Sequence, residues 1–334
     1  MKAADPLAGL PSLPAEQDLP HHEQVRAAVL AGITPGRPRR ALRPARRLLY
    51  PLGAAAAVAA IVTTLAVVLP SLAGHSAGSP PAPQPAGSGS MISPGTHIST
   101  FTGVRVLVIK DGAGTVSVTG SARHSVLVRA RVTARIPRGA ASSEISDGVL
   151  QLAFAAPDCP AAQRPCPSVN YAIQVPRALP VQVLGSTGDV SLSGLSGIVR
   201  VDDRAGDVSL AGLSGPAVTA RTDAGSVTMS GVSSAQLTVT ADAGDVHGTG
   251  LGSPATVVYA GAGDLSLGYA SAPDSVRITD PAGDITLGLP PGGTAYRVSA
   301  QTGAGSASVS VPQSATSHRI ITARSGAGDI TISN

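Results

Sequence analysis

Apolar and polar residues alternate with a period of two through the second half of the chain, and the alternating runs repeat. The run GDVSLSGL from Gly188 returns as GDVSLAGL from Gly206, and further copies follow at spacings of 18 to 23 residues. A second alternating pair lies seven and five residues before most of the starting glycines, such as Val199 and Val201 before Gly206. Period-two alternation predicts β-strands with one buried face, so each repeat should hold two short strands.

A repeat with only two short strands cannot bury its apolar side alone, but copies stacked about 4.8 Å apart bury it together. No segment of this region has helical periodicity, which excludes a βαβ sheet. We therefore predict an all-β fold, a β-solenoid of about 19-residue coils around a narrow aliphatic core, preceded by a single transmembrane helix. One coil of this core would contain Val199, Val201, Val208, Leu210 and Leu213.

Glycine and aspartate at the start of the repeats are the predicted structural turn residues, because glycine permits positive φ and aspartate accepts backbone N–H groups. They are Gly188, Asp189, Gly206, Asp207, Gly225, Gly244, Asp245, Gly263, Asp264, Gly283, Asp284, Gly305, Gly328 and Asp329. Stacked carboxylates could instead bind calcium, but the repeat lacks the paired glycine spacing of calcium-binding nonapeptides. We favour the interpretation in which each carboxylate caps its own turn.

The two parts of the predicted β region differ. Residues 97–179 contain longer excursions and are expected to form an N-terminal cap and the first coils, whereas residues 180–334 hold the regular repeats. The chain ends at Asn334 without a recognisable cap. An uncapped last rung would leave an exposed strand edge there.

Residues 48–72 form an uncharged, largely apolar segment. As a helix, this segment is long enough to cross a bilayer core of about 30 Å. Six arginines lie between Arg37 and Arg47, and the next basic residue is Arg105. This asymmetry predicts a single-pass cell-membrane protein with a cytoplasmic N-terminus and an extracellular C-terminal domain. Cleavage at the Ser71-Leu72-Ala73 segment is the alternative, although the leader would be unusually long.

The segments that flank the predicted anchor have linker-like compositions. Residues 1–47 are expected to be a short disordered cytoplasmic tail, in which residues 21–33 could form one short helix for a cytoplasmic partner. Residues 73–96 are rich in Pro, Gly and Ser and predict a linker that spaces the β region from the membrane.

The composition excludes several classes of function. Aromatic residues make up 2% of the chain, which disfavours sites that stack sugars or nucleobases. The net charge of +4 is located in residues 1–75, which contain eight basic and four acidic residues, so it does not indicate a nucleic-acid partner.

Candidate chemistry is sparse. Cys159 and Cys166 bracket a Pro-rich loop in a region predicted to lie outside the cytoplasm, and they are expected to form a disulfide rather than a metal pair. The scattered histidines match no catalytic arrangement, and the GxG pairs at coil corners precede no helix. We predict no catalytic residues, no cofactor and no metal ligands. The outward positions form a stripe of hydroxyl residues at Ser191, Ser209, Thr228, Ser266, Thr286 and Thr331.

The YAIQVP segment from Tyr171, the preceding LQL strand and the GD-V-S-L repeats resemble a bacterial adhesin-like β-strand repeat family, domain of unknown function 4097, over residues 98–334. The resemblance implies a surface-exposed or membrane-anchored protein without an established activity, and it supplies no catalytic residues. Three functions follow: a non-catalytic adhesin or envelope-binding protein with a glycan or protein ligand, a regulatory membrane protein that signals through residues 1–47, and, last, a cell-wall polysaccharide-active enzyme.

Overall fold

The structure, a computed structural model, describes residues 91–159 and 166–334. These residues form strands and contain no helix, so the all-β prediction is confirmed for them. Correspondingly, they include no helix of the length and hydropathy that a bilayer crossing requires. The predicted tail at 1–47, the predicted transmembrane helix at 48–72 and most of the predicted linker at 73–96 lie outside the described residues.

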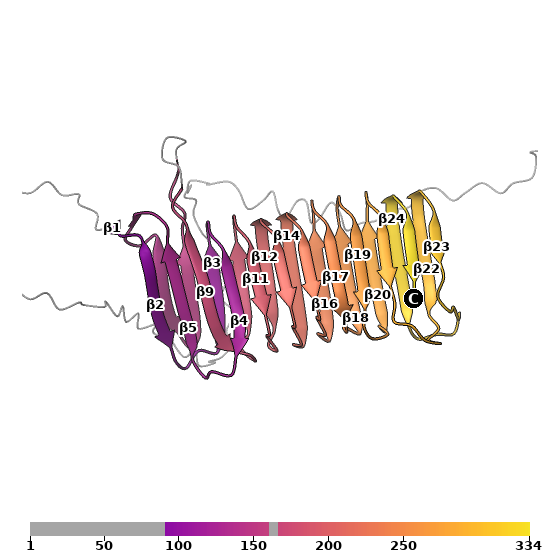
Figure 1. The fold of residues 1–334 in the computed structure, drawn as a ribbon, viewed down its shortest axis with the longest axis horizontal. Coiled ribbons are helices and arrows are strands. Elements are labelled where there is room, and N and C mark those ends of the chain that lie inside the picture. The colour runs from indigo at the N-terminus through magenta and orange to yellow at the C-terminus, as the bar shows by residue number, and fades with distance from the viewer. Residues whose placement is uncertain (1–90, 160–165) are drawn as a thin grey trace, which may run out of the picture. The chain divides into compact units, whose positions relative to one another are not determined.

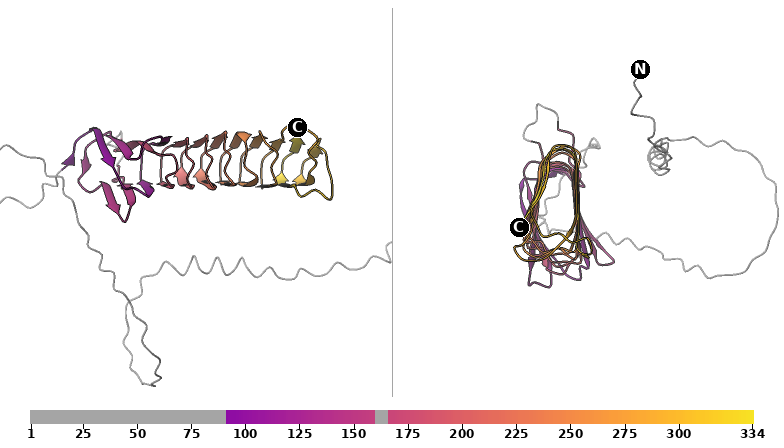
Figure 2. Two further views of the ribbon diagram at one scale, coloured as in Figure 1. Left: turned by 90° about the horizontal axis from the view of Figure 1, so that it is seen from below. Right: turned by 90° about the vertical axis from the view of Figure 1, so that its right-hand side faces the viewer.

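Two large sheets face each other and form the two long walls of a flattened coil, as the end-on view in Figure 2 shows. The core lies between them. In spatial order, the 11-stranded sheet consists of β22 (Arg297–Ala304), β24 (Ile320–Ala327), β20 (Ser275–Asp280), β18 (Ala255–Ala260), β16 (Gln236–Ala241), β14 (Ala217–Ala224), β12 (Val199–Ala205), β10 (Val181–Gly185), β3 (Val106–Asp111), β8 (Val149–Phe154) and β7 (Ala141–Ser146).

The strands of the facing 12-stranded sheet follow the corresponding order, here starting from the opposite, N-terminal end of the stack. It consists of β2 (Gly95–Phe101), β5 (Val126–Val132), β9 (Val169–Pro176), β4 (Val116–Ser121), β11 (Val190–Ser193), β13 (Val208–Ala211), β15 (Val227–Ser230), β17 (Val246–Leu251), β19 (Leu265–Tyr269), β21 (Ile285–Gly288), β25 (Ile330–Ser333) and β23 (Ala307–Val309). A short antiparallel pair, β1 (Met91–Ile92) with β6 (Ile136–Pro137), lies apart from both sheets.

One strand from each sheet, with the turns that join them, makes one coil, and successive coils stack in parallel register (Figure 1). Val199 of β12 pairs with Val218 of β14, and Val208 of β13 pairs with Val227 of β15. Equivalent apolar residues therefore lie directly above one another. The predicted core positions are confirmed, because Val199, Val201, Val208, Leu210 and Leu213 are all at most 1% exposed.

The stacking order departs from chain order at the N-terminal end. The coil of β3 and β4 lies between β10/β11 on one side and β8/β9 on the other, so the chain forms this coil before the outer one. Beyond β8 and β9, the strands β7, β5 and β2 add in antiparallel orientation. These antiparallel additions form the N-terminal end of both sheets.

The C-terminal end also departs from chain order, which corrects the expectation that the rung at Asn334 is the exposed edge. The last coil in the chain, β24/β25, is inserted between β20/β21 and β22/β23, and the outermost coil is β22/β23. The inserted coil buries Ile321, Ile330 and Ile332 at no more than 1% exposure. Strands β22 and β23 of the outermost coil contribute only the partly buried Val298, Ala300 and Val309 to the core, and the buried Tyr296 and Val311 of this coil lie outside the two strands. The more apolar coil thus occupies the position covered on both sides, where burial stabilises it most.

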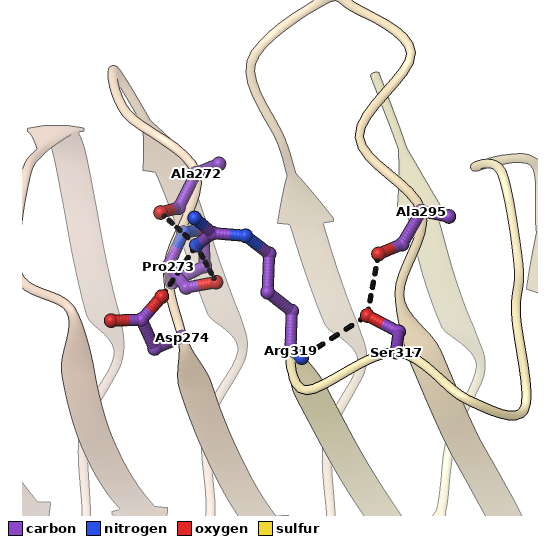
Figure 3. Close-up of polar contacts among 6 residues, drawn as sticks. All are labelled: Ala272, Pro273, Asp274, Ala295, Ser317 and Arg319. Atoms are coloured by element: carbon purple, nitrogen blue, oxygen red, sulfur yellow. Dashed lines mark hydrogen bonds and ion pairs between the residues drawn. The ribbon is translucent and has the colours of Figure 1, made fainter.

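A polar clamp holds the start of the inserted coil (Figure 3). The guanidinium of Arg319, the residue before β24, donates to the carbonyls of Ala272 at 2.8 Å and Pro273 at 2.9 Å and forms an ion pair with Asp274 at 2.6 Å. These three acceptors lie directly before β20. The backbone N–H of Arg319 donates to Ser317 Oγ, which itself donates to the carbonyl of Ala295. The clamp therefore joins the segment before β24 to the segment before β20 in the neighbouring coil.

Candidate functional site

The turn aspartates link neighbouring coils, which corrects the expectation that each carboxylate caps its own turn. Asp189 Oδ1 accepts the N–H of Asp207 at 3.1 Å, and Asp207 Oδ1 accepts the N–H of Ser226 at 2.8 Å. The same bond joins Asp245 to Asp264, Asp264 to Asp284, and Asp284 to Asp329. Parallel stacking causes this, because it places the amide of the next turn directly beside each carboxylate.

The ladder of turn aspartates ends at the outermost coil. There Ser306 stands in place of aspartate, and its N–H and hydroxyl both donate to Asp329 Oδ1. These two donors lower the pKa of the Asp329 carboxyl. Serine also takes the aspartate position in an interior coil, at Ser226, where the ladder is interrupted.

Glycine is required at the turns for a reason that the repeat alone does not reveal. Gly206 and Gly225 have φ of 152° and 139°, in the region that favours glycine. A Cβ on Gly206 would also collide with the carbonyl oxygen of Gly188 in the neighbouring coil, and one on Gly225 with that of Gly206. The other turn glycines with positive φ are Gly188, Gly244, Gly263, Gly305 and Gly328. Gly283 lacks positive φ, but a Cβ there would collide with the carbonyl oxygen of Gly263 in the neighbouring coil.

A column of hydroxyl side chains runs along the outer face of the 12-stranded sheet, parallel to the aspartate ladder. Its members occupy equivalent register positions in successive strands, and all but Ser266 are exposed. The name hydroxyl column is used below for Ser117, Ser191, Ser209, Thr228, Ser266, Thr286, Thr331 and Ser308. His247 lies in the same column between Thr228 and Ser266. The structure thus places the predicted outward hydroxyl residues in one line, which His247 interrupts.

Cys159 and Cys166 form a disulfide with a Cα–Cα distance of 5.5 Å, in the excursion between β8 and β9. The remaining reactive side chains are scattered. Within residues 91–159 and 166–334, no three His, Cys, Asp or Glu side chains converge in a way that would hold a metal ion. His247 lies in the hydroxyl column with neutral neighbours in register, Thr228 and Ser266.

Two buried carboxylates meet inside the 11-stranded sheet. Asp111 at the end of β3 pairs in register with Gly185 of β10, and Asp203 of β12 lies on the other side of Gly185. A Cβ on Gly185 would collide with Asp203 Oδ1, so the glycine leaves the space that this carboxylate occupies. Asp203 is 0% exposed and Asp111 is 4% exposed. Asp111 Oδ1 accepts the N–H of Ala113 at 3.3 Å, but Asp111 Oδ2 and both oxygens of Asp203 lack a partner.

Burial governs the ionisation of this carboxyl pair. Desolvation raises the pKa of Asp111 to about 7, the N–H of Ala113 opposes the shift, and the charge of Asp203 adds to it. Desolvation also raises the pKa of Asp203. On the facing sheet, burial and then the charge of Asp111 raise the pKa of the Tyr171 hydroxyl. Ionising this pair as the pH rises therefore lowers the stability of the folded protein.

This pair was not predicted from the residue pattern, although a signal was present. Inward positions lie seven and five residues before each starting glycine, and the alternation continues to three residues before it. Asp111, Gly185 and Asp203 all occupy that third position. An aspartate at an inward position of an aliphatic repeat is unusual because burying its charge is unfavourable.

Replacing Asp111 with asparagine is expected to stabilise the protein above neutral pH. The folded-state pKa lies above the unfolded value of 3.8, so the wild-type stability is full below about pH 4 and declines as the pH rises through about 7. A shift of this size corresponds to about 4 kcal/mol at most. The Asp111→Asn variant should unfold with a free energy higher by about 2–4 kcal/mol at pH 8, and similar to wild type at pH 4. Urea titrations of the full chain in mild detergent measure this difference.

Asp280→Asn provides the comparison for this experiment. Asp280 sits at the same inward position of β20, is 0% exposed, and accepts the N–H of Ala282 as Asp111 accepts that of Ala113. Burial raises its pKa too, but no second buried carboxylate lies across a glycine from it. The Asp280→Asn substitution should therefore also raise the free energy of unfolding at pH 8, but by less than Asp111→Asn does. If the free energy of unfolding changed with pH in the same way in Asp111→Asn and wild type, the prediction would be contradicted.

Similar proteins are found among families and solved structures. The model of the family described as Toastrack DUF4097 matches residues 112–334. A candidate cell adhesion protein from Clostridium sporogenes ATCC 15579 is 14% identical, with 72% of this chain and 99% of that chain covered and a TM-score of 0.26. A candidate adhesin from Bacteroides fragilis NCTC 9343 is 14% identical, with 74% and 98% covered and a TM-score of 0.40.

A candidate adhesin from Parabacteroides distasonis ATCC 8503 is 12% identical, with 74% of this chain and 98% of that chain covered and a TM-score of 0.34. None of the curated proteins matches this sequence. The family model spans the stacked coils from the residue after β3 to the last residue of the chain. The chain therefore belongs to the Toastrack DUF4097 family.

Proposed function

We propose that this chain is a non-catalytic binding protein of the cell envelope, anchored in the membrane by residues 48–72 with its β-solenoid on the extracellular side. The hydroxyl column is the observation that carries the proposal. A row of exposed Ser and Thr side chains in register offers one hydrogen-bonding group per coil along the outer face.

The arrangement of this face indicates the class of ligand. Each hydroxyl group both donates and accepts, and each net hydrogen bond contributes only about 0.5–1.5 kcal/mol. Useful affinity therefore requires many contacts in series, which an extended polymer supplies and a small molecule does not. A polysaccharide of the envelope, with hydroxyl groups along its length, matches this requirement.

The aspartate ladder narrows the class further. Its carboxylates lie two residues before the hydroxyl column, for example Asp207 before Ser209, and most of them are exposed. A row of negative charges beside the column disfavours strongly anionic polymers. We therefore favour a neutral or amine-bearing glycan.

Substitution within the hydroxyl column tests the proposal. Arginine at Thr228 and Thr286 together places two long side chains across the flat face without touching the core, since both residues are exposed. Co-sedimentation of the full chain with purified cell-wall glycan should then weaken by about tenfold. Thr238→Arg, which alters an exposed residue on the outer face of the opposite sheet, should bind like wild type.

Two further outcomes would contradict the proposal. Equal binding by the Thr228/Thr286 variant and wild type would remove the hydroxyl column as the binding face. Deleting residues 1–47 should leave binding unchanged, because the ligand contacts only the solenoid. If the cellular phenotype of a null mutant were reproduced by this deletion alone, a regulatory role of the tail would replace the binding role.

A further inference from the structure

Three exposed arginines lie on three adjacent strands at the C-terminal end of the 11-stranded sheet, on the opposite sheet from the hydroxyl column (Figure 1). They are Arg277 of β20, Arg324 of β24 and Arg297 at the start of β22, and we call them the arginine patch. The residues on either side of Arg277, Val276 and Ile278, are buried in the core. Strand alternation therefore directs the arginine to the outer face of the sheet.

The register of the strands gives the spacing of the patch. Arg277 is in register with Thr322, two residues before Arg324. Arg324 is in register with Gln301, four residues after Arg297. Strands about 4.8 Å apart that rise about 3.3 Å per residue place the Cα atoms of Arg277 and Arg324 about 8 Å apart, and those of Arg324 and Arg297 about 14 Å apart. The three cations thus spread over more surface than one phosphate or carboxylate group spans.

The charge of the patch is not neutralised within the described residues. All ion pairs formed by residues 91–159 and 166–334 involve Arg221 or Arg319. The outward positions of β18, β20, β24 and β22 carry no carboxylate. At the margins of this surface, Asp242 pairs with Arg221 and Asp274 with Arg319. The aspartate ladder lies beyond the turns, at the start of strands of the other sheet, as Asp329 does directly before β25.

The surface beside the arginines is polar, with a small apolar margin. Val257 and Tyr259 of β18 are 46% and 39% exposed, and they are in register with Arg277 and Thr279. These two side chains can contact the carbon backbone of an extended ligand between its charged groups. They supply too little apolar area to enter a bilayer, which requires a broad apolar face.

We propose that the arginine patch binds an anionic polymer of the cell envelope that carries a phosphate or carboxylate group in each repeat unit. Guanidinium groups bind both kinds of oxyanion through paired N–H donors. Each exposed contact contributes little, so useful affinity requires several contacts along one chain. A nucleic acid is disfavoured because binding of single strands relies on several aromatic rings, and this surface has one.

This assignment goes beyond the proposed function, which gives a neutral or amine-bearing glycan to the hydroxyl column. Only the location in the envelope rests on that proposal. The two sheets would bind polymers of different charge. Binding of cell-wall glycan by the hydroxyl column is measured with the Thr228/Thr286 variant, so either proposal can fail while the other stands.

Biolayer interferometry on the full chain in phosphatidylcholine nanodiscs tests the assignment, with poly(glycerol phosphate) and polygalacturonate as the probes. We expect saturable binding of at least one polymer at about 150 mM salt. Binding by either polymer alone supports the assignment and identifies the anionic group. In Arg277→Gln/Arg297→Gln/Arg324→Gln the affinity should fall by about tenfold. Because all three residues are exposed, hydrogen exchange of β20 and β24 should remain as in wild type.

A second triple variant is the matched control. Arg129→Gln/Arg131→Gln/Arg200→Gln removes the same charge from exposed residues of β5 and β12, outside the patch. It should bind within about twofold of wild type, because charges farther away than a Debye length of about 8 Å are largely screened.

Four results would overturn the assignment. They are no binding of either polymer, equal affinity in the patch variant and wild type, an equal loss in the control variant, and binding of phosphatidylglycerol vesicles without binding of either polymer. The third result would mean that net charge alone attracts the polymer. The fourth would make this surface a membrane contact instead.

Discussion

Replacing Leu210 with aspartate is expected to unfold the middle of the solenoid. Leu210 is 1% exposed and stacks between Leu192 of β11 and Met229 of β15. The substitution removes an aliphatic group whose burial contributes about 1.5–3 kcal/mol and introduces an unpaired buried charge that costs several more. Because each coil is held only by its two neighbours, a failure at one coil spreads to both.

Hydrogen exchange with mass spectrometry on the full chain measures this effect region by region. Peptides from β11, β13 and β15 should lose protection in Leu210→Asp. Ser209→Asp is the matched control, because Ser209 is the adjacent residue of the same strand and is exposed. It should change stability by about 0.5 kcal/mol or less. Wild-type protection in Leu210→Asp would show that Leu210 does not face the core.

Removing residues 316–334 is expected to release more of the solenoid than the deleted segment itself. The deletion eliminates β24 and β25, which are the only in-register partners that β22 and β23 have within the described part of the chain. It also removes Arg319 and its clamp on the residues before β20. Residues 297–309 should therefore lose their exchange protection, although they remain in the chain, whereas the coils from β3/β4 to β18/β19 should keep theirs.

A variant of the outermost coil provides the reverse comparison. Val309→Ser weakens β23, which is partly exposed and pairs only with β25. Protection of β24 and β25 should persist, because these strands still contact β20 and β21. If residues 297–309 instead stayed protected after the deletion, they would have docked on β20 and β21, which is the arrangement that chain order predicts.

The regular part of the fold was predictable because it depends on local pattern. Strand side chains alternate between two faces, so the aliphatic positions around Val208 and Leu210 specify which side of each strand is buried. The repeat length then specifies the coil, and the glycines mark its turns. These features need only residues within one or two repeats of each other, and the structure confirms the buried positions.

The order of the coils at the C-terminal end depends on which coil gains most from the position that has a neighbouring coil on both sides. Every coil presents similar strand edges to its neighbours, so the period alone cannot rank them. The coil with Ile321, Ile330 and Ile332 takes the doubly covered place, and the coil with Val298 and Val309 is left outside. The same stacking directs each turn carboxylate to the amide of the next coil rather than its own.

The residue pattern was sufficient to specify an all-β stack of short coils, its aliphatic interior and its glycine turns, because these follow from the two-residue period of a strand and the room available at each turn. Which coils lie side by side depends on contacts between distant parts of the chain. The tertiary structure brings Asp111 and Asp203 together across Gly185 because β3, formed early in the chain, stacks against β10 rather than against the strands that follow it.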